Sequence, residues 1–438
     1  MGTTLYVDWV LGAWACLAVL ASAAAMGADV QWRHLSSKTG DLPVPGESTQ
    51  QTAAVVGDFA KDGVNGFILG FRQKAPALVW YRKTAAGWDR YVIEKEYLTI
   101  EAGGAVCDID GDGLPDIVFG GDWQSNQVWW WKNPEPPYDP KVSWKRYTIK
   151  KSGATQHHDQ AFGDFKGTGR PQLAFWNQGT KKLFIADIPA RPTEVDVWPA
   201  TEVFSGSAGE NPGKYAEGLS AADVDGCGKP EILAGNYMFK YLGDNKFKAV
   251  KLGDVGGLIF AGRFKPGKYL NVVIAPGDGS GPLRWYECTG DPTESRSWLG
   301  HDLAGRDMIH PHSLQVADID GDGNLDIFCA EMAKWTESRK DPDNPNAKAY
   351  IFWGDGKGNF RKTEFASGMG FHEARVADLN ADGKLDILSK PYNWDVPRVD
   401  VWLQVAAPAG GAAAAPAAAG AAPAATEASA AGKPAIGL

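Results

Sequence analysis

The sequence predicts an all-β fold in which one four-stranded unit occurs seven times around a ring. Three observations lead to this prediction: a recurrent motif of alternating aspartates and glycines, an interval of 40 to 60 residues between its copies, and short apolar or aromatic segments at fixed places around each copy. A strand-rich unit of that size, repeated this often, is typical of a β-propeller rather than of a solenoid. We therefore expect a seven-bladed β-propeller of four-stranded blades.

The motif is complete in three places. It reads Asp108-Ile-Asp110-Gly-Asp112-Gly113-Leu-Pro-Asp116 in the second unit, and it recurs from Asp318 and from Asp378. A weaker copy starts at Asp223, and degenerate copies start at Asp58, Asp164 and Arg263. Successive starts are 50, 56, 59, 40, 55 and 60 residues apart, which sets the length of one blade.

Each unit supplies four strand-like segments. One short apolar segment precedes the motif and another follows it, as in IVFG after Asp116. An aromatic segment comes third, for example VWWWKN at 128–133, and a fourth reads GWDRYVI at 87–93. Four short strands separated by glycine-rich turns match one propeller blade.

The seventh unit ends at its third strand, VDVWLQ at 399–404, and so lacks a fourth. Residues 31–36, QWRHLS, repeat the tryptophan-x-basic pattern of the fourth strands GWDRY and SWKRY. We therefore expect the N-terminal strand to complete blade seven, which leaves no open sheet edge in the ring.

The two ends of the chain differ from the repeats between them. Residues 9–28 are almost uninterrupted apolar and end in small residues, which predicts a secretory signal peptide over 1–28, cleaved near Ala25 or Ala28. A 20-residue stretch is also long enough to stay as an anchor helix. The propeller is then expected over 29–404, and the Ala/Pro-rich tail 405–438 is expected to be disordered. This organisation predicts a secreted or periplasmic protein.

The composition narrows the classes of binding partner that the protein is expected to have. The chain carries 44 Lys plus Arg against 53 Asp plus Glu, for a formal net charge of −9. That balance favours neither nucleic acid nor an anionic membrane as a partner, and no membrane contact is expected once the signal peptide is cleaved. With 44% hydrophobic residues, the chain is also too apolar for wholesale disorder.

The repeated loops resemble a known family. The D-x-D-x-D-G-x-x-D pattern between the first and second strands, followed by an apolar run ending in small residues, is similar to the FG-GAP/VCBS repeats of integrin-type calcium-binding β-propellers. The resemblance covers about 29–404 and is strongest in units two, six and seven. It implies the propeller fold and calcium in the motif loops.

The loop chemistry also favours calcium. Carboxylates at positions one, three and five converge because the glycine at six permits a sharp turn, and a carboxylate at nine closes the far side. Oxygen-only ligands suit Ca²⁺ better than zinc, although aspartate and glycine also form such turns without metal. The expected ligands of structural Ca²⁺ are Asp108, Asp110, Asp112, Asp116, Asp223, Asp225, Glu231, Asp318, Asp320, Asp322, Asp326, Asp378, Asn380, Asp382 and Asp386. In unit four Cys227 stands at position five, and a thiol is a poor calcium ligand.

Three histidines share one repeat position. Counting back six residues from each motif start gives Thr52, Ala102, His158, Glu217, Gly257, His312 and His372. Equivalent positions of a propeller lie at equivalent places around its axis. Three imidazoles and one carboxylate are therefore expected to converge on a solvated mouth of the central channel, at the end opposite the motif loops.

The connections from second to third strands should lie on that same face. They carry tryptophan and tyrosine beside polar residues, and the candidates for substrate binding are Trp123, Trp335, Lys390, Tyr392 and Trp394. Aromatic rings stack on the C–H faces of a sugar while its hydroxyls need donors and acceptors, so the set favours carbohydrate as the partner.

His158, Glu217, His312 and His372 have three interpretations. They can act as general acid and base, they can hold a transition metal such as zinc or manganese, or they can form a polar plug. No G-x-S-x-G, P-loop or H-E-x-x-H motif occurs, so serine hydrolases, NTPases and zincins are set aside.

The function predicted is a secreted calcium-binding propeller that acts on or binds carbohydrate, with a lean towards a sugar lyase or dehydratase. The segment VWWWKNPEP after DIDGDGLPDIVFGG resembles the propeller of aldos-2-ulose (anhydrofructose) dehydratases, and polysaccharide lyase propellers are a weaker likeness. The alternative is a non-enzymatic, calcium-dependent adhesion or ligand-binding propeller, as FG-GAP domains are in integrins.

Overall fold

The computed structural model describes residues 30–206 and 216–405. The expected signal peptide 1–28 lies outside the described residues, and so does the expected tail 405–438 except for Val405. Among the described residues, no helix is long and apolar enough to span a membrane.

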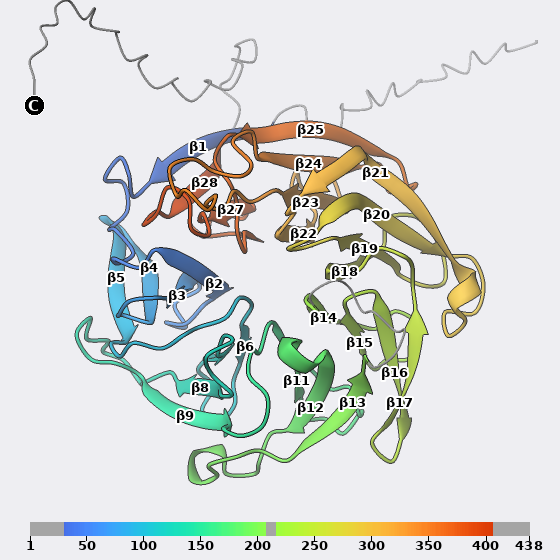
Figure 1. Ribbon diagram of the computed structural model, residues 1–438, viewed down its shortest axis with the longest axis horizontal. Coiled ribbons are helices and arrows are strands. Elements are labelled where there is room, and N and C mark those ends of the chain that lie inside the picture. The colour runs from blue at the N-terminus through green and yellow to red at the C-terminus, as the bar shows by residue number, and fades with distance from the viewer. Residues whose placement is uncertain (1–29, 207–215, 406–438) are drawn as a thin grey trace, which may run out of the picture.

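Seven antiparallel sheets of four strands each stand around a central axis (Figure 1). Blade one is β2 (Gln50–Gly57), β3 (Gly66–Arg72), β4 (Leu78–Thr84) and β5 (Gly87–Glu94). Blade two is β6 (Ala105–Cys107), β7 (Asp116–Gly120), β8 (Val128–Lys132) and β9 (Lys145–Lys150). Blade three is β10 (Gln160–Gly163), β11 (Gln172–Asn177), β12 (Lys182–Asp187) and β13 (Ala200–Ser205). Blades four and five are β14 (Leu219–Ala222), β15 (Glu231–Ala234), β16 (Tyr237–Gly243) and β17 (Lys246–Lys251); and β18 (Leu258–Gly262), β19 (Asn271–Ala275), β20 (Ser280–Cys288) and β21 (Trp298–Ile309).

The last two blades complete the ring. Blade six is β22 (Ser313–Ala317), β23 (Asp326–Ala330), β24 (Lys348–Gly354) and β25 (Phe360–Ser367), and blade seven is β26 (Arg375–Ala377), β27 (Asp386–Ser389), β28 (Asp400–Val405) and β1 (Gln31–Ser36). The helices of the described residues are short 3-10 turns, Gln178–Thr180, Pro192–Glu194 and Ser295–Ser297. The predicted all-β, seven-bladed propeller is confirmed.

The N-terminal strand closes the ring as predicted. β1 pairs antiparallel with β28, in a register that runs from Gln31 opposite Val405 to Ser36 opposite Asp400. The His34 ring stacks on Trp402 with centroids 4.6 Å apart. β28 therefore extends one residue past the predicted boundary at 404, because Val405 still pairs with β1.

Apolar side chains fill the spaces between neighbouring sheets. The second strand of blade one, β3, is buried at all seven positions, as expected for a continuous apolar run. The aromatic third strands place Trp80, Trp130 and Trp131 among the largest fully buried side chains. Packing between blades thus explains the high tryptophan content and holds the ring rigid around its axis.

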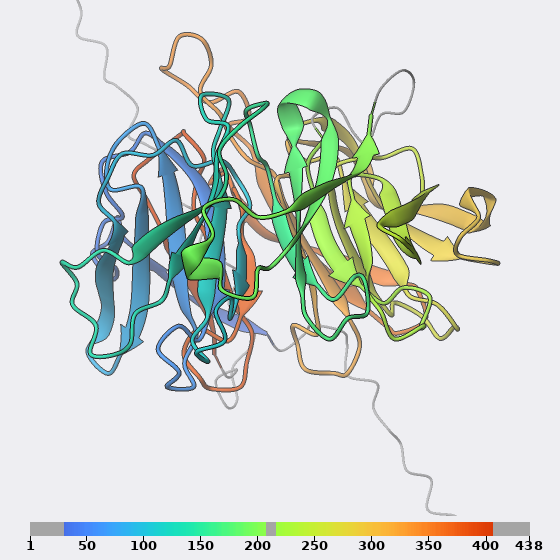
Figure 2. The same ribbon diagram turned by 90° about the horizontal axis from the view of Figure 1, so that it is seen from below.

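Two faces follow from the strand order. Each innermost strand leads into a D-x-D loop and returns as the second strand, so all motif loops lie at one end of the ring, which we call the motif face. The starts of the innermost strands and the connections from second to third strands lie at the other end, the top face. Figure 2 shows the strands running between these two layers of loops.

Candidate functional site

The motif loops share one backbone geometry, whether or not they are rich in carboxylates. In blade two the Gly113 N–H donates to Asp108 Oδ2 over 3.0 Å, and in the degenerate copy of blade three Gly169 donates to Asp164 Oδ2 over 2.6 Å. Gly113 has φ 88° and Gly169 has φ 79°, a region open to glycine because it has no Cβ. Aspartate and glycine therefore shape these turns by themselves.

The side chain at position nine ties the motif loop to its blade in every blade except blade one, where this residue is Gly66. Asp116 is buried and accepts N–H bonds from Ile109 at 3.0 Å and from Asn133 at 2.8 Å. Its uncharged counterpart in blade five, Asn271, accepts from Phe264 at 3.1 Å in the same way. Equivalent bonds to the loop are made by Glu231, Asp326 and Asp386. This position has a structural role that needs no metal.

Carboxylate oxygens nevertheless gather in two complete copies. Oxygens within 4.8 Å of one another come from Asp108, Asp110 and Asp116 in blade two and from Asp318, Asp320 and Asp326 in blade six. At position five, Asp112 and Asp322 accept the N–H groups of Leu114 and Asn324. Blade four groups Asp223, Asp225 and Cys227, and in blade seven Asp378 accepts from the Asn380 N–H and the Asn380 amide donates to Asp382.

One position on the third strand distinguishes these loops. In blade two this position is Lys132. The residue after position nine is Ile117, which pairs with Trp131 on the third strand, and Lys132 directly follows Trp131. The equivalent position in the other blades is found in the same way. The Lys132 ammonium contacts both Asp110 and Asp112. Although partial burial opposes its charge, the two carboxylates raise the pKa of Lys132. The chain thus places its own cation in this loop.

The same position is occupied differently in the other acidic blades. Lys240 contacts Asp225 in blade four, and Arg82 contacts Asp62 at 2.8 Å in blade one. The equivalent residues are uncharged in blades six and seven, where they are Trp353 and Leu403. Within 30–206 and 216–405, the Asp318 Oδ1 atom of blade six is buried without a hydrogen-bond partner. The loop of blade six therefore fits a divalent metal ion, whereas the loop of blade two is already occupied by the ammonium group of Lys132.

On the top face the structure brings together the four residues of the shared repeat position. Ligand atoms of His158, Glu217 and His312 lie within 4.8 Å of one another. The His312 ring stacks on His372 with centroids 4.4 Å apart, and His158 meets His312 edge-on at 5.4 Å. We call these four residues the channel cluster.

The cluster is buried, and the expectation of a solvated mouth is wrong. His158 and His372 are each 3% exposed, and His312 and Glu217 are each 1% exposed. Connections from the second strands pack over them: the Asp278 N–H donates to Glu217 Oε1 over 2.7 Å. A Cβ on Gly277, which has φ 64°, would lie 2.1 Å from that same oxygen. Close backbone packing therefore replaces the water expected there.

Carboxylates flank two of the imidazoles. His158 Nδ1 lies 2.6 Å from Asp159 Oδ2, and His312 Nδ1 lies 3.4 Å from Glu373 Oε1. Glu217 Oε2 faces both rings, at 3.9 Å from His158 Nε2 and 3.6 Å from His312 Nε2. Within the described residues, Glu217 Oε2 and His312 Nδ1 are buried atoms without a hydrogen-bond partner. The cluster thus has unmet donor and acceptor capacity.

These neighbours push the pKa values of the imidazoles apart. Burial opposes the charge on His158, but Asp159 outweighs it and raises the pKa of His158 to about 9. Burial likewise opposes charge on His312, yet Glu217 and Glu373 raise its pKa. The pKa of His372 is lowered by burial and by Lys390. Two cationic rings therefore lie beside a neutral one.

The donor set of His158, Glu217 and His312 can also hold a metal. Two imidazoles and one carboxylate are ligands that zinc and manganese accept, and the unpartnered Glu217 Oε2 suits such a role. Binding there would require both cationic imidazoles to lose a proton first.

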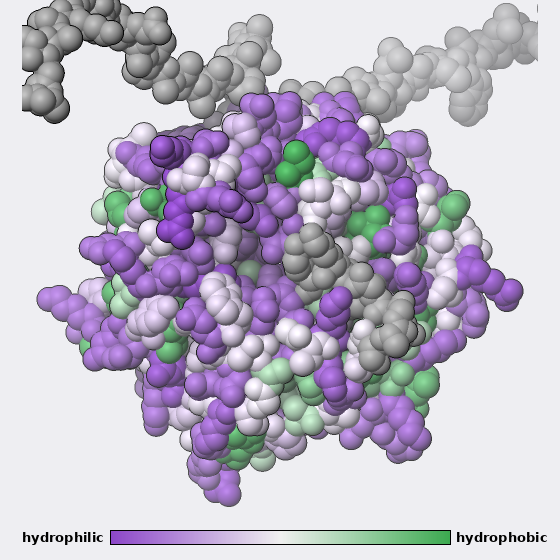
Figure 3. Space-filling view, viewed as in Figure 1, coloured by the Kyte–Doolittle hydropathy of each residue, from purple (hydrophilic) through white to green (hydrophobic). Residues whose placement is uncertain are grey.

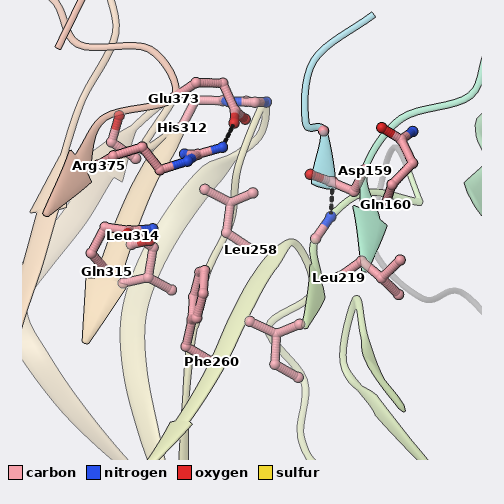
Figure 4. Close-up of a pocket in the computed structure, with 14 residues that line it drawn as sticks. Asp159, Gln160, Leu219, Leu258, Phe260, His312, Leu314, Gln315, Glu373 and Arg375 are labelled. Atoms are coloured by element: carbon pink, nitrogen blue, oxygen red, sulfur yellow. Dashed lines mark hydrogen bonds and ion pairs between the residues drawn. The ribbon is translucent and has the colours of Figure 1, made fainter. Parts of the chain in front are cut away.

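A cavity of about 220 Å³ opens inside the channel next to the cluster. Figure 4 shows polar side chains on two sides of it, with His312, Glu373 and Arg375 on one side and Asp159 and Gln160 on the other. The apolar side chains of Leu258 and Phe260 lie between the two groups. Small-molecule sites commonly measure about 300–1,000 Å³, so this cavity is smaller than the common range and has room for a single ring at most.

The predicted substrate-binding residues are distributed between the rim and the interior. Trp123 is 49% exposed and lies over the Arg72 guanidinium at 4.7 Å, whereas Tyr392 stacks on His372. Lys390 is buried, and its Nζ donates to the Gln51 carbonyl at 2.8 Å. Trp335 and Trp394 are half-buried, and the Trp335 N–H donates to Asn393 Oδ1 over 2.9 Å. Figure 3, viewed along the ring axis, shows a mostly hydrophilic face that is hollowed near its centre.

Residues 341–389 match the family model of the FG-GAP-like repeat. The chain is a seven-bladed β-propeller that carries an FG-GAP-like repeat. No curated protein shows a significant match to it.

Several solved structures are similar to this propeller. A lectin from Agrocybe aegerita, which recognises non-reducing terminal N-acetylglucosamine, is 18% identical, with 83% of this chain and 88% of that chain covered and a TM-score of 0.44. The exotype rhamnogalacturonan lyase YesX is 15% identical, covering 86% and 75%, with a TM-score of 0.44. BBS1N in complex with ARL6DN is 12% identical, covering 87% and 98%, with a TM-score of 0.48. Function therefore has to be read from the residues of this chain.

Sequence reasoning missed four charged partners of the cluster, Arg72, Asp159, Asp278 and Arg375. Arg72 ends its second strand just as Lys390 follows the second strand of blade seven, so alignment of strand ends would have found it. Asp159 shares its offset with Glu373, since each directly follows a cluster histidine, so the repeat position would have found it as well. Asp278 and Arg375 stand at positions of their own.

Proposed function

We propose that this propeller binds carbohydrate on its top face and that the channel cluster exchanges protons with the bound sugar. The observation that carries the proposal is the position of buried imidazole–carboxylate pairs against a cavity lined by both polar and apolar side chains. The apolar C–H face of a sugar ring packs on side chains such as Phe260 and Leu258, while its hydroxyls find acceptors and donors in Asp159 and Arg375.

The reaction class that suits these groups is elimination by a carbon–oxygen lyase or dehydratase. One group removes a proton from a carbon next to a carbonyl, a double bond forms, and the oxygen on the adjacent carbon leaves with a proton from a second group. Titratable neighbours whose pKa values are driven apart are suited to such paired roles. His312, which lines the cavity, is the proton donor in this proposal, and the carboxylate of Asp159, which also lines it, is the acceptor. The neutral His372 stacks on His312 and positions its ring.

Calcium belongs to the proposal as a structural ion. In blade six, carboxylate oxygens of Asp318, Asp320 and Asp326 gather beside a third strand that carries the uncharged Trp353 at the position of Lys132. Blade seven carries the uncharged Leu403 at that position. Both sites lie on the motif face, at the end of the ring opposite the cluster, so calcium acts there by holding strand connections.

A second candidate is a ligand-binding propeller without catalysis, and the burial of the cluster favours it. Side chains that are 1–3% exposed reach a substrate only through the cavity. In that case the cluster stabilises the channel, and Trp123 on the rim makes the contacts with ligand.

Incubation with a glycan panel, with assays for both binding and unsaturated products, tests the proposal. The variants are His372→Ala and, as a matched control, His301→Ala, whose imidazole is 37% exposed on the outer strand β21 and stacks on Trp285. Product formation that is lost in His372→Ala and kept in the control supports catalysis. Binding without product supports the second candidate, and the absence of both rejects the carbohydrate proposal. Metal analysis of the same proteins separates a metal site from proton transfer.

A further inference from the structure

We infer that the sugar bound in the channel cavity beside the cluster is uncharged or carries an amino group, and that acidic glycans such as polyuronates are excluded from that cavity. The inference rests on the proposed function, because it presupposes that a sugar binds. It follows from one juxtaposition: the basic side chains around the channel cluster each face a carboxylate of this chain or are buried against carbonyl oxygens.

Arg72 is the basic group nearest the exposed Trp123, and its guanidinium is already occupied. It forms ion pairs with Glu101 and, at 3.2 Å, with Asp122. Its Nη1 donates to the Tyr392 hydroxyl over 3.1 Å, and its side chain is 5% exposed. A carboxylate usually binds arginine through two parallel N–H bonds, and the surroundings of Arg72 leave no such fork for a ligand.

The other basic groups are engaged in the same way. Lys334 Nζ lies 3.1 Å from Asp278 Oδ1, and Arg375 pairs with Glu373. Lys390 donates to the carbonyls of Gln51 at 2.8 Å and His372 at 3.2 Å. Burial lowers the pKa of Lys390 well below its usual value. Neither lysine offers a free ammonium to an acidic sugar.

Carboxylates outnumber the permanent cations around the cluster. The acidic residues are Glu101, Asp122, Asp159, Glu217, Asp278 and Glu373, and the permanently charged basic residues are Arg72, Lys334 and Arg375. These described residues carry three positive and six negative formal charges, so their formal net charge is −3. With both His158 and His312 protonated it is −1. The site is therefore negative in either protonation state.

This charge selects between classes of sugar. In this cavity an added uronate would meet carboxylates whose neighbouring cations are already paired, and like charges across an interface disfavour binding. The exposed Arg339, which stacks on Trp335 at 4.8 Å, lies outside the cavity, in the connection between the second and third strands of blade six. An uncharged sugar needs hydrogen bonds alone, and paired carboxylates still supply them because each has about four lone-pair sites. An amino sugar adds a favourable charge. Elimination next to a sugar carboxylate is thereby excluded, and elimination next to a carbonyl remains.

A binding panel of matched sugars tests the inference. Each hexose is offered to the full chain as the unmodified sugar, the 2-amino sugar and the uronate. At least one neutral or amino form should bind, with its uronate weaker by about tenfold or more. A uronate that binds as tightly as its neutral form overturns the inference while the proposed function stands. Failure of every form of every sugar overturns the proposed function, and the inference with it.

Two further measurements examine the electrostatic cause. Asp278→Asn releases Lys334, so uronate affinity should rise several-fold, whereas the control Asp187→Asn, which releases Lys166 on the motif face, should leave the sugar preference unchanged. An unchanged preference in Asp278→Asn contradicts the role of this pair. Added salt screens repulsion, so residual uronate binding to the wild-type chain should strengthen with ionic strength. Binding that weakens instead reveals net attraction and overturns the inference, even if Asp278→Asn fails to fold.

Discussion

Replacing Lys132 should create a calcium site in blade two. The Lys132 ammonium contacts Asp110 and Asp112, while the residue at the same position in blade six is the uncharged Trp353. Lys132→Met keeps the length and apolar stem of the side chain but removes the cation. The loop then has the charge pattern of blade six, so the variant should bind one calcium ion more than the wild-type chain.

The expected magnitudes follow from exposure and mass action. Lys132 is 30% exposed, and its partners Asp110 and Asp112 are 12% and 25% exposed. Pairs in this range contribute about 0.2–1 kcal/mol each, so without calcium the variant should lose about 1 kcal/mol of unfolding free energy. An ion that binds only the folded chain stabilises it by about 2.7 kcal/mol when present at 100 times its Kd. With excess calcium the variant should therefore match or exceed the wild-type stability.

Calorimetric titration with calcium and thermal unfolding with and without EDTA measure both effects. Lys166→Met is the matched control, because Lys166 pairs with Asp187 beside a loop that has no acidic residues at positions three and five. The control should gain no ion. A wild-type chain that loses one bound calcium on Asp110→Asn would show that blade two binds the ion despite Lys132, and the reasoning would fail.

The sequence predicted the ring well because its evidence was periodic. The spacing of Asp108, Asp318 and Asp378 established the blade length, and the tryptophan-x-basic pattern of 31–36 located the closing strand. Each of these patterns lies within one blade, and the ring is built by repeating that blade, so local patterns were enough to predict it. The role of Asp116 was incompletely predicted, since one of its two backbone bonds comes from Asn133, which lies on the far side of the next hairpin.

Three further outcomes are expected. A chain truncated through Ser37 loses β1 and exposes the edge of β28, so its Tm and solubility should fall relative to a chain starting at residue 30, and equal values would show that the ring closes otherwise. His312→Ala removes one partner of buried ion pairs and should cost about 3–5 kcal/mol in urea unfolding, against little change for His301→Ala; similar losses in both would contradict the burial argument. Because the pKa of His158 is raised from 6.5 to about 9, the stability from its pair with Asp159 is fully present below pH 6.5 and is lost as pH rises towards 9. Urea unfolding at both ends of this window should show that loss in the wild-type chain, and an equal loss in His158→Gln would refute it.

The channel cluster was only half predictable, and the missing half determines its chemistry. The repeat offset alone placed His158, His312 and His372 at one level of the axis. Charge and burial depend on neighbours that differ from blade to blade: Asp159 pairs with the histidine it follows, Glu373 pairs with His312 of the preceding blade, and Asp278 contacts Glu217 from another blade. An imidazole facing a carboxylate is cationic and one facing an ammonium is neutral, so these irregular neighbours turn three equivalent histidines into unequal ones. Catalysis by the cluster, if the product assay finds it, depends on that inequality.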